Sequence, residues 1–256
     1  MIWEAIRDLF GDDAPKPLFK PEWKNILGAN VPVYSKLPED LKERLHERIA
    51  NFVAHTRFEG CNGLKLTEEM ILTVAGQACL LVIHRDGKPY PKLTTVYLYP
   101  STFSSVIKRQ DSVGIVTEGK VQRLGESWET GTVILSWYSV AQGARNPNDA
   151  RNVTLHEFAH QLDHENGDTD GAPPLTDRAA YRSWSKVFSA NYLDLQERVD
   201  AGKRTLLDPY GATEPAEFFA VATETFFEKP KQLSSRRPDL YSELRNYYGV
   251  DPMEWG

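Results

Sequence analysis

Apolar residues recur at helical spacing over several stretches of this chain. After Pro38 they fall every three or four positions, which predicts an amphipathic helix of about four turns. The apolar positions of this face are Leu41, Leu45, Ile49, Phe52 and Val53. Thr67 can cap a second, largely buried helix that continues to about Leu81 and carries two acids in its first turn. Four further helices are predicted at residues 148–165, 176–198, 214–228 and 239–247.

Strand patterns lie between these helices. Residues 94–99 and 132–138 alternate in polarity and are rich in β-branched and aromatic side chains, which indicates β-strands. Residues 1–35 carry four prolines among scattered aromatics and predict an irregular arm that lies over the core. The pattern as a whole predicts a single α+β domain over residues 1–256, with a small mixed sheet beside a mostly helical half.

Composition narrows the class of protein. Hydrophobic residues make up 41% and charged residues 26%, which is typical of a folded globular chain. The net charge is −6 and no basic cluster is visible, so nucleic acid is excluded as a direct partner. The longest apolar run, residues 78–83, is too short to cross a membrane. We find no secretory signal, and two cysteines make no disulfide framework, so we expect a cytoplasmic protein.

One segment carries recognisable chemistry, the His-Glu-x-x-His sequence from His156 to His160. Residues four apart share one face of a helix, so both imidazoles can converge on one metal ion. Glu157 would lie beside that ion and could take a proton from metal-bound water. The alternative is two histidines and an acid on a solvated helix face. Apolar neighbours that favour a buried helix are Leu155, Phe158, Ala159 and Leu162.

A catalytic zinc site needs a third protein ligand. His164 continues the spacing, but helical rise places it ~12 Å along the axis from His156, too far for one ion. The metzincin pattern requires glycine and histidine where this chain has Asp163 and Asn166, so that class is rejected. The remaining possibility is a glutamate from a later helix, which is the gluzincin arrangement.

The helix predicted at residues 214–228 supplies candidates. Pro215 suits its first turn, and Glu217 and Glu224 share one face of an otherwise apolar helix. Buried carboxylates need a partner or a metal. The alternative is two solvated acids on an amphipathic helix.

Several motifs together resemble the Mlc titration factor A family, which are bacterial zinc-dependent, glucose-regulated metallopeptidases. In the C-terminal half they are His156-Glu157-Phe158-Ala159-His160-Gln161-Leu162-Asp163, Asp208-Pro209-Tyr210 and Pro215-Ala216-Glu217-Phe218-Phe219-Ala220. In the N-terminal half they are residues 30–34, 58–64 and 75–81. The resemblance spans about residues 20–250.

The resemblance implies a zincin-like metallopeptidase core that binds one Zn²⁺ per chain. The implied ligands are His156, His160 and Glu217, with Glu157 as the general base of peptide hydrolysis. Tyr210, seven residues before Glu217, would donate a hydrogen bond to the oxyanion of the tetrahedral intermediate. The implied activity is aminopeptidase-like, on short peptides, and the partner is a peptide or protein substrate.

Two further roles are hypotheses from position. Asp163 or Glu224 could accept a hydrogen bond from a ligand imidazole, although Asp163 suits a solvated surface equally well. The strand near residues 133–137 could be an edge strand that pairs with an extended peptide, or an ordinary core strand.

Other classes of function remain to be weighed. Members of the resembled family are implicated in sequestering a transcriptional repressor, so a non-catalytic binding protein is the main rival. The apolar residues between Leu240 and Trp255 could form an interaction patch, although we favour docking on the core. A calcium site at residues 163–170 lacks EF-hand spacing, and no serine or cysteine hydrolase signature is present.

Overall fold

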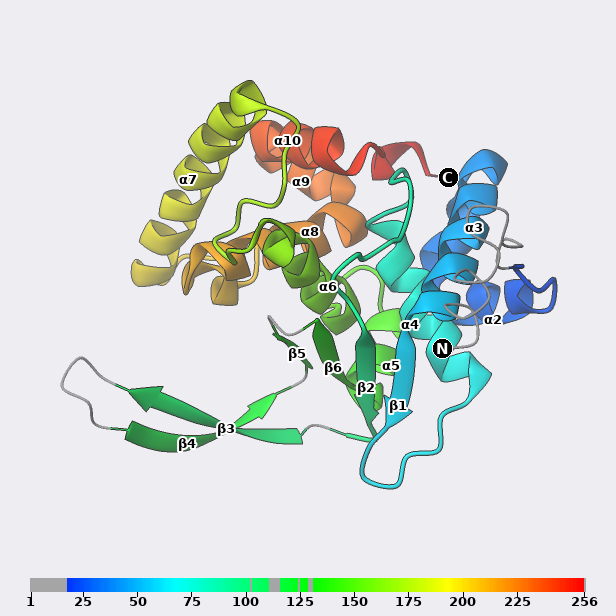
Figure 1. Ribbon diagram of the computed structural model, residues 1–256. Coiled ribbons are helices and arrows are strands. Elements are labelled where there is room, and N and C mark those ends of the chain that lie inside the picture. Colours follow the sequence, from blue (N-terminus) through cyan, green and yellow to red (C-terminus); the bar gives the residue numbers. More distant parts are fainter. Residues whose placement is uncertain (1–17, 102, 111–115, 124, 129–130, 256) are drawn as a thin grey trace.

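The computed structural model describes residues 18–255 except 102, 111–115, 124 and 129–130 (Figure 1). The helices are α2 (Trp23–Asn30), α3 (Glu39–His55), α4 (Glu68–Leu80), α5 (Trp137–Arg145), α6 (Val153–Asp163), α7 (Arg178–Asp200), α8 (Pro215–Glu228), α9 (Pro230–Arg236) and α10 (Pro238–Tyr248). Short 3₁₀ turns are η2 (Pro32–Lys36), η3 (His164–Asn166), η4 (Pro209–Ala212) and η5 (Pro252–Glu254). The strands are β1 (Arg57–Gly60), β2 (Thr95–Tyr99), β3 (Phe103–Gln110), β4 (Val116–Arg123), β5 (Gly125–Trp128) and β6 (Thr132–Ser136).

A small mixed sheet forms the base of the helical part, as the α+β prediction required. Its order is β1-β2-β6-β5, with β1, β2 and β6 parallel and β5 antiparallel to β6. Among the described residues, β3 and β4 pair with each other alone, as an antiparallel ribbon that extends to one side in Figure 1. The sequence pattern did not predict this ribbon, which falls in the glycine-punctuated stretch between the two expected strands.

The edge-strand interpretation of residues 133–137 is wrong. β6 pairs with β2 on one side and with β5 on the other, so its backbone groups are already engaged. The strand also ends earlier than predicted, at Ser136, whose side chain accepts a hydrogen bond from the Ser139 N–H (3.3 Å) and caps α5. Because of this cap, Trp137 and Tyr138 begin helix α5, although the alternating pattern predicted that they continue the strand. The edge of the sheet on this side is β5.

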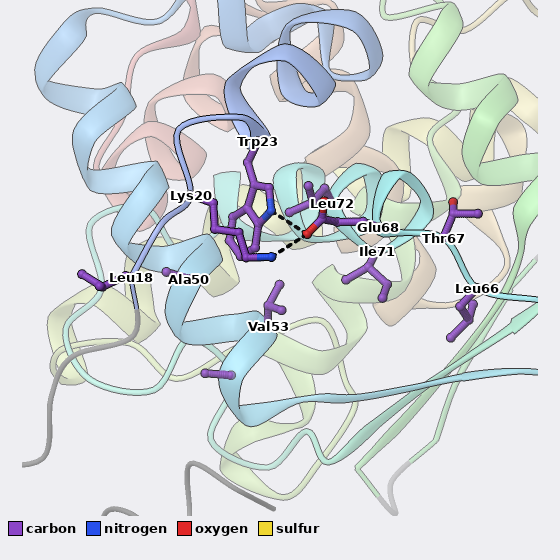
Figure 2. A pocket seen from close by; sticks show the side chains of 11 residues that line it. Leu18, Lys20, Trp23, Ala50, Val53, Leu66, Thr67, Glu68, Ile71 and Leu72 are labelled. Atoms are coloured by element: carbon purple, nitrogen blue, oxygen red, sulfur yellow. Dashed lines mark hydrogen bonds and ion pairs between the residues drawn. The ribbon is translucent and has the colours of Figure 1, made fainter.

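The N-terminal arm is only partly as expected. Residues 1–17, with Trp3 and Phe10, lie outside the described residues. From residue 18 onward the chain covers the core as predicted, but as α2 and η2 rather than as irregular backbone. Trp23 is buried and donates its indole N–H to the Glu68 carboxylate of α4 (2.9 Å). Figure 2 shows this contact at a cavity of about 410 Å³ between residues 18–23, α3 and α4.

The remaining helix predictions are confirmed within a few residues. Thr67 caps α4 through the Met70 N–H (3.2 Å), and α7, α8 and α10 lie where periodicity placed them. The helix predicted over residues 148–165 begins later, at Val153, and α9 was not predicted. The C-terminal segment docks on the core through Leu240, Tyr241, Leu244 and Tyr248. None of the described helices is long and apolar enough to cross a membrane.

The contact of α6 with α8 places the candidate site. The inner face of α6 carries Phe158 and Leu162, which are fully buried, and Phe158 packs edge-to-face on Tyr90 of the segment between α4 and β2. The loop after α6 is tied down at Gly171, whose N–H donates to Asp163 (2.8 Å) and whose carbonyl accepts from the Trp184 indole N–H of α7 (2.8 Å). This loop therefore joins the end of α6 to α7 and, by direct contact, to the start of α8.

Gly171 should be sensitive to substitution. Its φ is +81°, and an added Cβ would lie 2.4 Å from the Pro215 carbonyl oxygen at the start of α8. Gly167 in the same loop also has positive φ (+111°), but its Cβ would meet nothing within 4 Å. We expect Gly167→Ala to cost ~1 kcal/mol of unfolding free energy from backbone strain. Gly171→Ala should cost a further ~1–3 kcal/mol because the helices must shift. Urea unfolding of both variants measures the difference, and equal midpoints would contradict this packing.

Candidate metal centre

The two motif histidines project from α6 toward α8. Asn152 caps the helix, since its side-chain oxygen accepts from the Thr154 and Leu155 N–H groups, both at 3.1 Å. One helical turn separates His156 from His160, and their rings lie edge-to-face with centroids 5.0 Å apart. Both side chains are about seven-eighths buried, which restricts their orientation and leaves a small part of each exposed.

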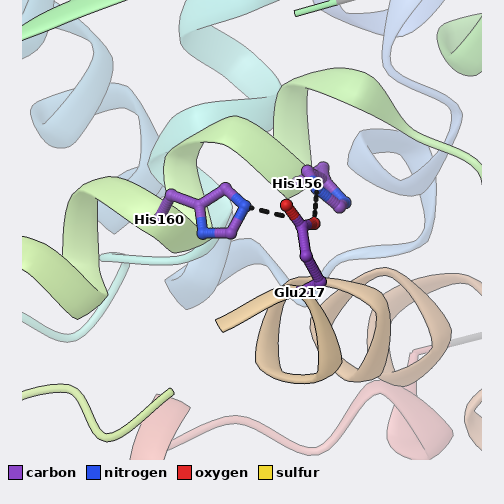
Figure 3. Close-up of side chains that lie close together, drawn as sticks. All are labelled: His156, His160 and Glu217. Atoms are coloured by element: carbon purple, nitrogen blue, oxygen red, sulfur yellow. Dashed lines mark hydrogen bonds and ion pairs between the residues drawn. The ribbon is translucent and has the colours of Figure 1, made fainter. Parts of the chain in front are cut away.

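Glu217 meets these rings from the first turn of α8. Figure 3 shows its carboxylate between the two imidazole rings, with a contact to each. Its Oε2 is 2.9 Å from Nε2 of His156 and 3.5 Å from Nε2 of His160. One candidate ligand atom from each residue lies within 4.8 Å of the others. The structure therefore brings together all three residues that the resemblance implied as ligands.

This donor set fits a metal ion. Two imidazoles and one carboxylate leave a further coordination position open, as in hydrolytic metal sites. Both Nε2 atoms face the same carboxylate oxygen, so one ion could replace the contacts they now make with it. His164 contributes nothing to the cluster, because it lies in η3 and contacts the Thr169 hydroxyl (3.3 Å).

The electrostatics of the cluster favour a protonated imidazole beside an ionised carboxylate. Burial lowers the pKa of His156, but Glu224 and the hydrogen bond with Glu217 outweigh burial and hold that pKa well above its usual value. Burial likewise raises the pKa of Glu217, but hydrogen bonds with both imidazoles hold it well below its usual value. A metal must displace the proton on His156, so metal and protons compete for this site.

Glu224 and Asp163, the two acids given hypothetical supporting roles, are both buried. Glu224 places Oε2 3.5 Å from Nδ1 of His156, the ring atom that faces away from Glu217. Asp163 is fully buried, which excludes a solvated surface role, and it accepts from the Gly171 N–H. Burial raises the pKa of Asp163 to about 6. Of the two, only Glu224 contacts a ring of the cluster.

Glu157 and Tyr210 flank the cluster. Glu157 follows His156 on α6 and is buried, with 6% of its surface exposed. Tyr210 lies in η4 and is half exposed, and its hydroxyl donates to Oε1 of Glu217 (3.1 Å). Asp208 fixes this turn by accepting from the Tyr210 N–H (3.0 Å). The structure thus places a buried acid and a more exposed phenol at the same cluster.

Two residues that hold the site together were not predicted from the sequence. Asn152 caps α6, and the signal was present as an N-cap residue type directly before the apolar periodicity of the motif. Arg151 pairs with Asp208 (3.0 Å) and joins the start of α6 to the turn that carries Tyr210. No local pattern could reveal that pair, because its members lie 57 residues apart.

Comparison with known proteins agrees with the motifs. A family model described as glucose-regulated metallo-peptidase M90 matches residues 12–249. An uncharacterized protein of Synechocystis sp. is 40% identical over 234 residues, which cover 91% of this chain and 85% of that protein. Mlc titration factor A of Serratia proteamaculans is 32% identical, covering 91% of this chain and 88% of its own length. Mlc titration factor A of Yersinia pestis is 30% identical, covering 97% and 91%. The chain therefore belongs to the M90 family of glucose-regulated metallo-peptidases.

Proposed function

We propose that this protein is a zinc-dependent peptidase, with one Zn²⁺ held by His156, His160 and Glu217. The observation that carries the proposal is the convergence of these three side chains within 4.8 Å on two packed helices. Two imidazoles and a carboxylate are the protein ligands of a recognised class of catalytic zinc site. Membership of a metallo-peptidase family supports the same reaction class.

The chain's own residues would divide the chemistry. The zinc ion would act as a Lewis acid toward the scissile carbonyl and would make water a stronger acid. Glu157 would accept the proton of the attacking water and pass it to the leaving amine. Its place beside His156 on α6 and its burial in the site support this role.

Tyr210 would stabilise the oxyanion. Its hydroxyl already donates to Glu217, and about half of the side chain is exposed to solvent. A phenol donor at this position would strengthen its hydrogen bond as negative charge develops on the carbonyl oxygen. The Asp208 turn and its Arg151 partner would hold the phenol in place.

An extended peptide would pair with β5. This strand lies at the edge of the sheet, antiparallel to β6, and packs against α6. Strand addition at such an edge satisfies main-chain hydrogen bonds and would present a peptide beside the motif helix. Aminopeptidase-like activity on short peptides rests on the resemblance to the family.

Repressor binding is the second candidate function. Relatives that cover most of this chain carry the name Mlc titration factor A. From that name and the family resemblance, we propose that this chain binds a transcriptional repressor protein. The two functions separate if a variant without hydrolysis still binds the repressor.

Removing the third ligand should release the metal. We expect the wild-type protein to hold about one zinc ion per chain. Substitutions of residues that contact a metal ligand weaken metal affinity by ~10- to 100-fold. Glu217→Ala removes a ligand itself, so its zinc affinity should fall by more than that. Glu214→Ala, at the exposed cap of the same helix, should keep the metal. Metal analysis of freshly purified proteins measures this. Full zinc occupancy in Glu217→Ala would place the third ligand elsewhere.

Glu157→Gln separates metal binding from catalysis. The amide keeps the size of the side chain but cannot accept a proton, so peptide hydrolysis should fall ~10²- to 10⁴-fold. Zinc content and repressor binding should stay unchanged. Peptide assays beside metal analysis test this, and hydrolysis at the wild-type rate would show that another group is the base.

Tyr210→Phe removes only the hydroxyl. We expect kcat to fall ~10²-fold while zinc content is retained, because the donor acts mainly in the transition state. Tyr192→Phe is the matched control, since its hydroxyl donates to the Ala212 carbonyl in the same η4 turn (3.3 Å) without touching Glu217. Equal kinetics in the two variants would assign Tyr210 a packing role.

A further inference from the structure

Four buried polar side chains meet at the start of α6: Gln77, Asn152, Glu224 and Glu228. Each exposes 8% of its surface or less, although three different helices or caps supply them. Burying such groups is unfavourable unless they are hydrogen-bonded to one another. The cluster lies one helical turn before His156, so its geometry bears directly on that ring.

Asn152 is held through each of its polar side-chain atoms. Its Oδ1 accepts from the first turn of α6, and its Nδ2 donates to Oε1 of Gln77 (2.7 Å) and to Oε1 of Glu228 (3.0 Å). The Gln77 amide is fixed in turn by the Thr73 carbonyl (3.0 Å). The backbone N–H of Asn152 therefore has a fixed position and direction relative to α6.

Glu224 uses that N–H and the histidine ring together. Its Oε1 accepts from the Asn152 N–H (2.8 Å), and its Oε2 lies 3.5 Å from Nδ1 of His156. Two acceptor oxygens are needed to face two donors, and a carboxylate supplies both. A glutamine has a single acceptor oxygen, so it could satisfy one donor only while its NH₂ opposes the other.

We propose that Glu224 is a positioning residue for His156, held in register by Asn152. By accepting from Nδ1–H it keeps a proton on that nitrogen and directs Nε2 toward the space beside Glu217 where the metal would bind. Carboxylates that accept from metal-bound imidazoles fix the tautomer and strengthen the ligand in this manner. The inference rests on the metal site of the proposed function.

Glu224→Gln and Glu228→Gln form a matched pair for the test. Both residues are buried on α8, one turn apart, and both contact Asn152. Burial raises the pKa of Glu228 to about 8, and a glutamine there keeps the oxygen that accepts from the Asn152 amide. Competition with a chromophoric chelator gives the zinc affinity of each full-length protein.

We expect zinc affinity to fall ~10- to 100-fold in Glu224→Gln and to stay near wild type in Glu228→Gln. The ¹⁵N–¹H signals of the zinc-loaded His156 ring should show Nδ1–H in wild type and Glu228→Gln, and a shifted or lost signal in Glu224→Gln. A purely structural role for Glu224 would leave those ring signals unmoved.

If Glu224→Gln fails to fold, Asn152→Ser tests the side-chain contacts that hold Asn152, and through it Glu224, in position. Serine still caps α6 and keeps the backbone N–H, but it loses both Nδ2 contacts. We expect weaker zinc binding, by a smaller factor than for Glu224→Gln. Wild-type affinity and ring signals in these variants would overturn the positioning role alone. A wild-type protein that binds no zinc would overturn the proposed function, and this inference with it.

Discussion

The packing of α6 against α8 is the constraint on which the rest of the structure depends. It places a carboxylate from one helix between two imidazoles from the other, with Oε2 of Glu217 2.9 Å and 3.5 Å from their Nε2 atoms. Three ionisable groups in a mostly buried site are unfavourable unless they interact with one another or with a metal. α8 is anchored in the core by fully buried aromatic side chains, which include Phe218, Phe219 and Phe226, and this fixes the position of Glu217.

Two ties keep these helices in register. At the end of α6, Asp163 accepts from Gly171, and this loop touches Pro215 at the start of α8. At the start of α6, Asn152 meets Glu224 from the far end of α8. The helices are thus fixed at both ends of their crossing, and the candidate ligands lie between the ties. A site held in this way is preorganised, which limits the reorganisation needed on metal binding or catalysis.

Local chemistry explains what the sequence could predict. The His156–His160 pair was predictable because a spacing of four fixes one face of a helix, and Thr67 was predictable as a cap from residue type alone. The sequence pattern left two acids, Glu217 and Glu224, as candidates for the third ligand. The family resemblance pointed to Glu217. Helix boundaries were found to within a few residues wherever apolar periodicity was strong.

Non-local pairing explains what the sequence could not predict. The order of the sheet, with β6 inside and β5 at the edge, depends on long-range pairing that alternation does not encode. The Ser136 cap ended a strand whose apolar and aromatic pattern continued into α5. The Arg151–Asp208 pair and the Glu224–Asn152 contact join residues 57 and 72 positions apart. These contacts form only when the fold does, so they leave no periodic signal.

The most direct test of this account is anomalous diffraction at the zinc edge from crystals of the zinc-loaded protein. We expect one strong peak bonded to Nε2 of His156, Nε2 of His160 and the Glu217 carboxylate, each at about 2.0–2.2 Å. Absence of a peak between α6 and α8, or a zinc bound there without Glu217, would contradict it.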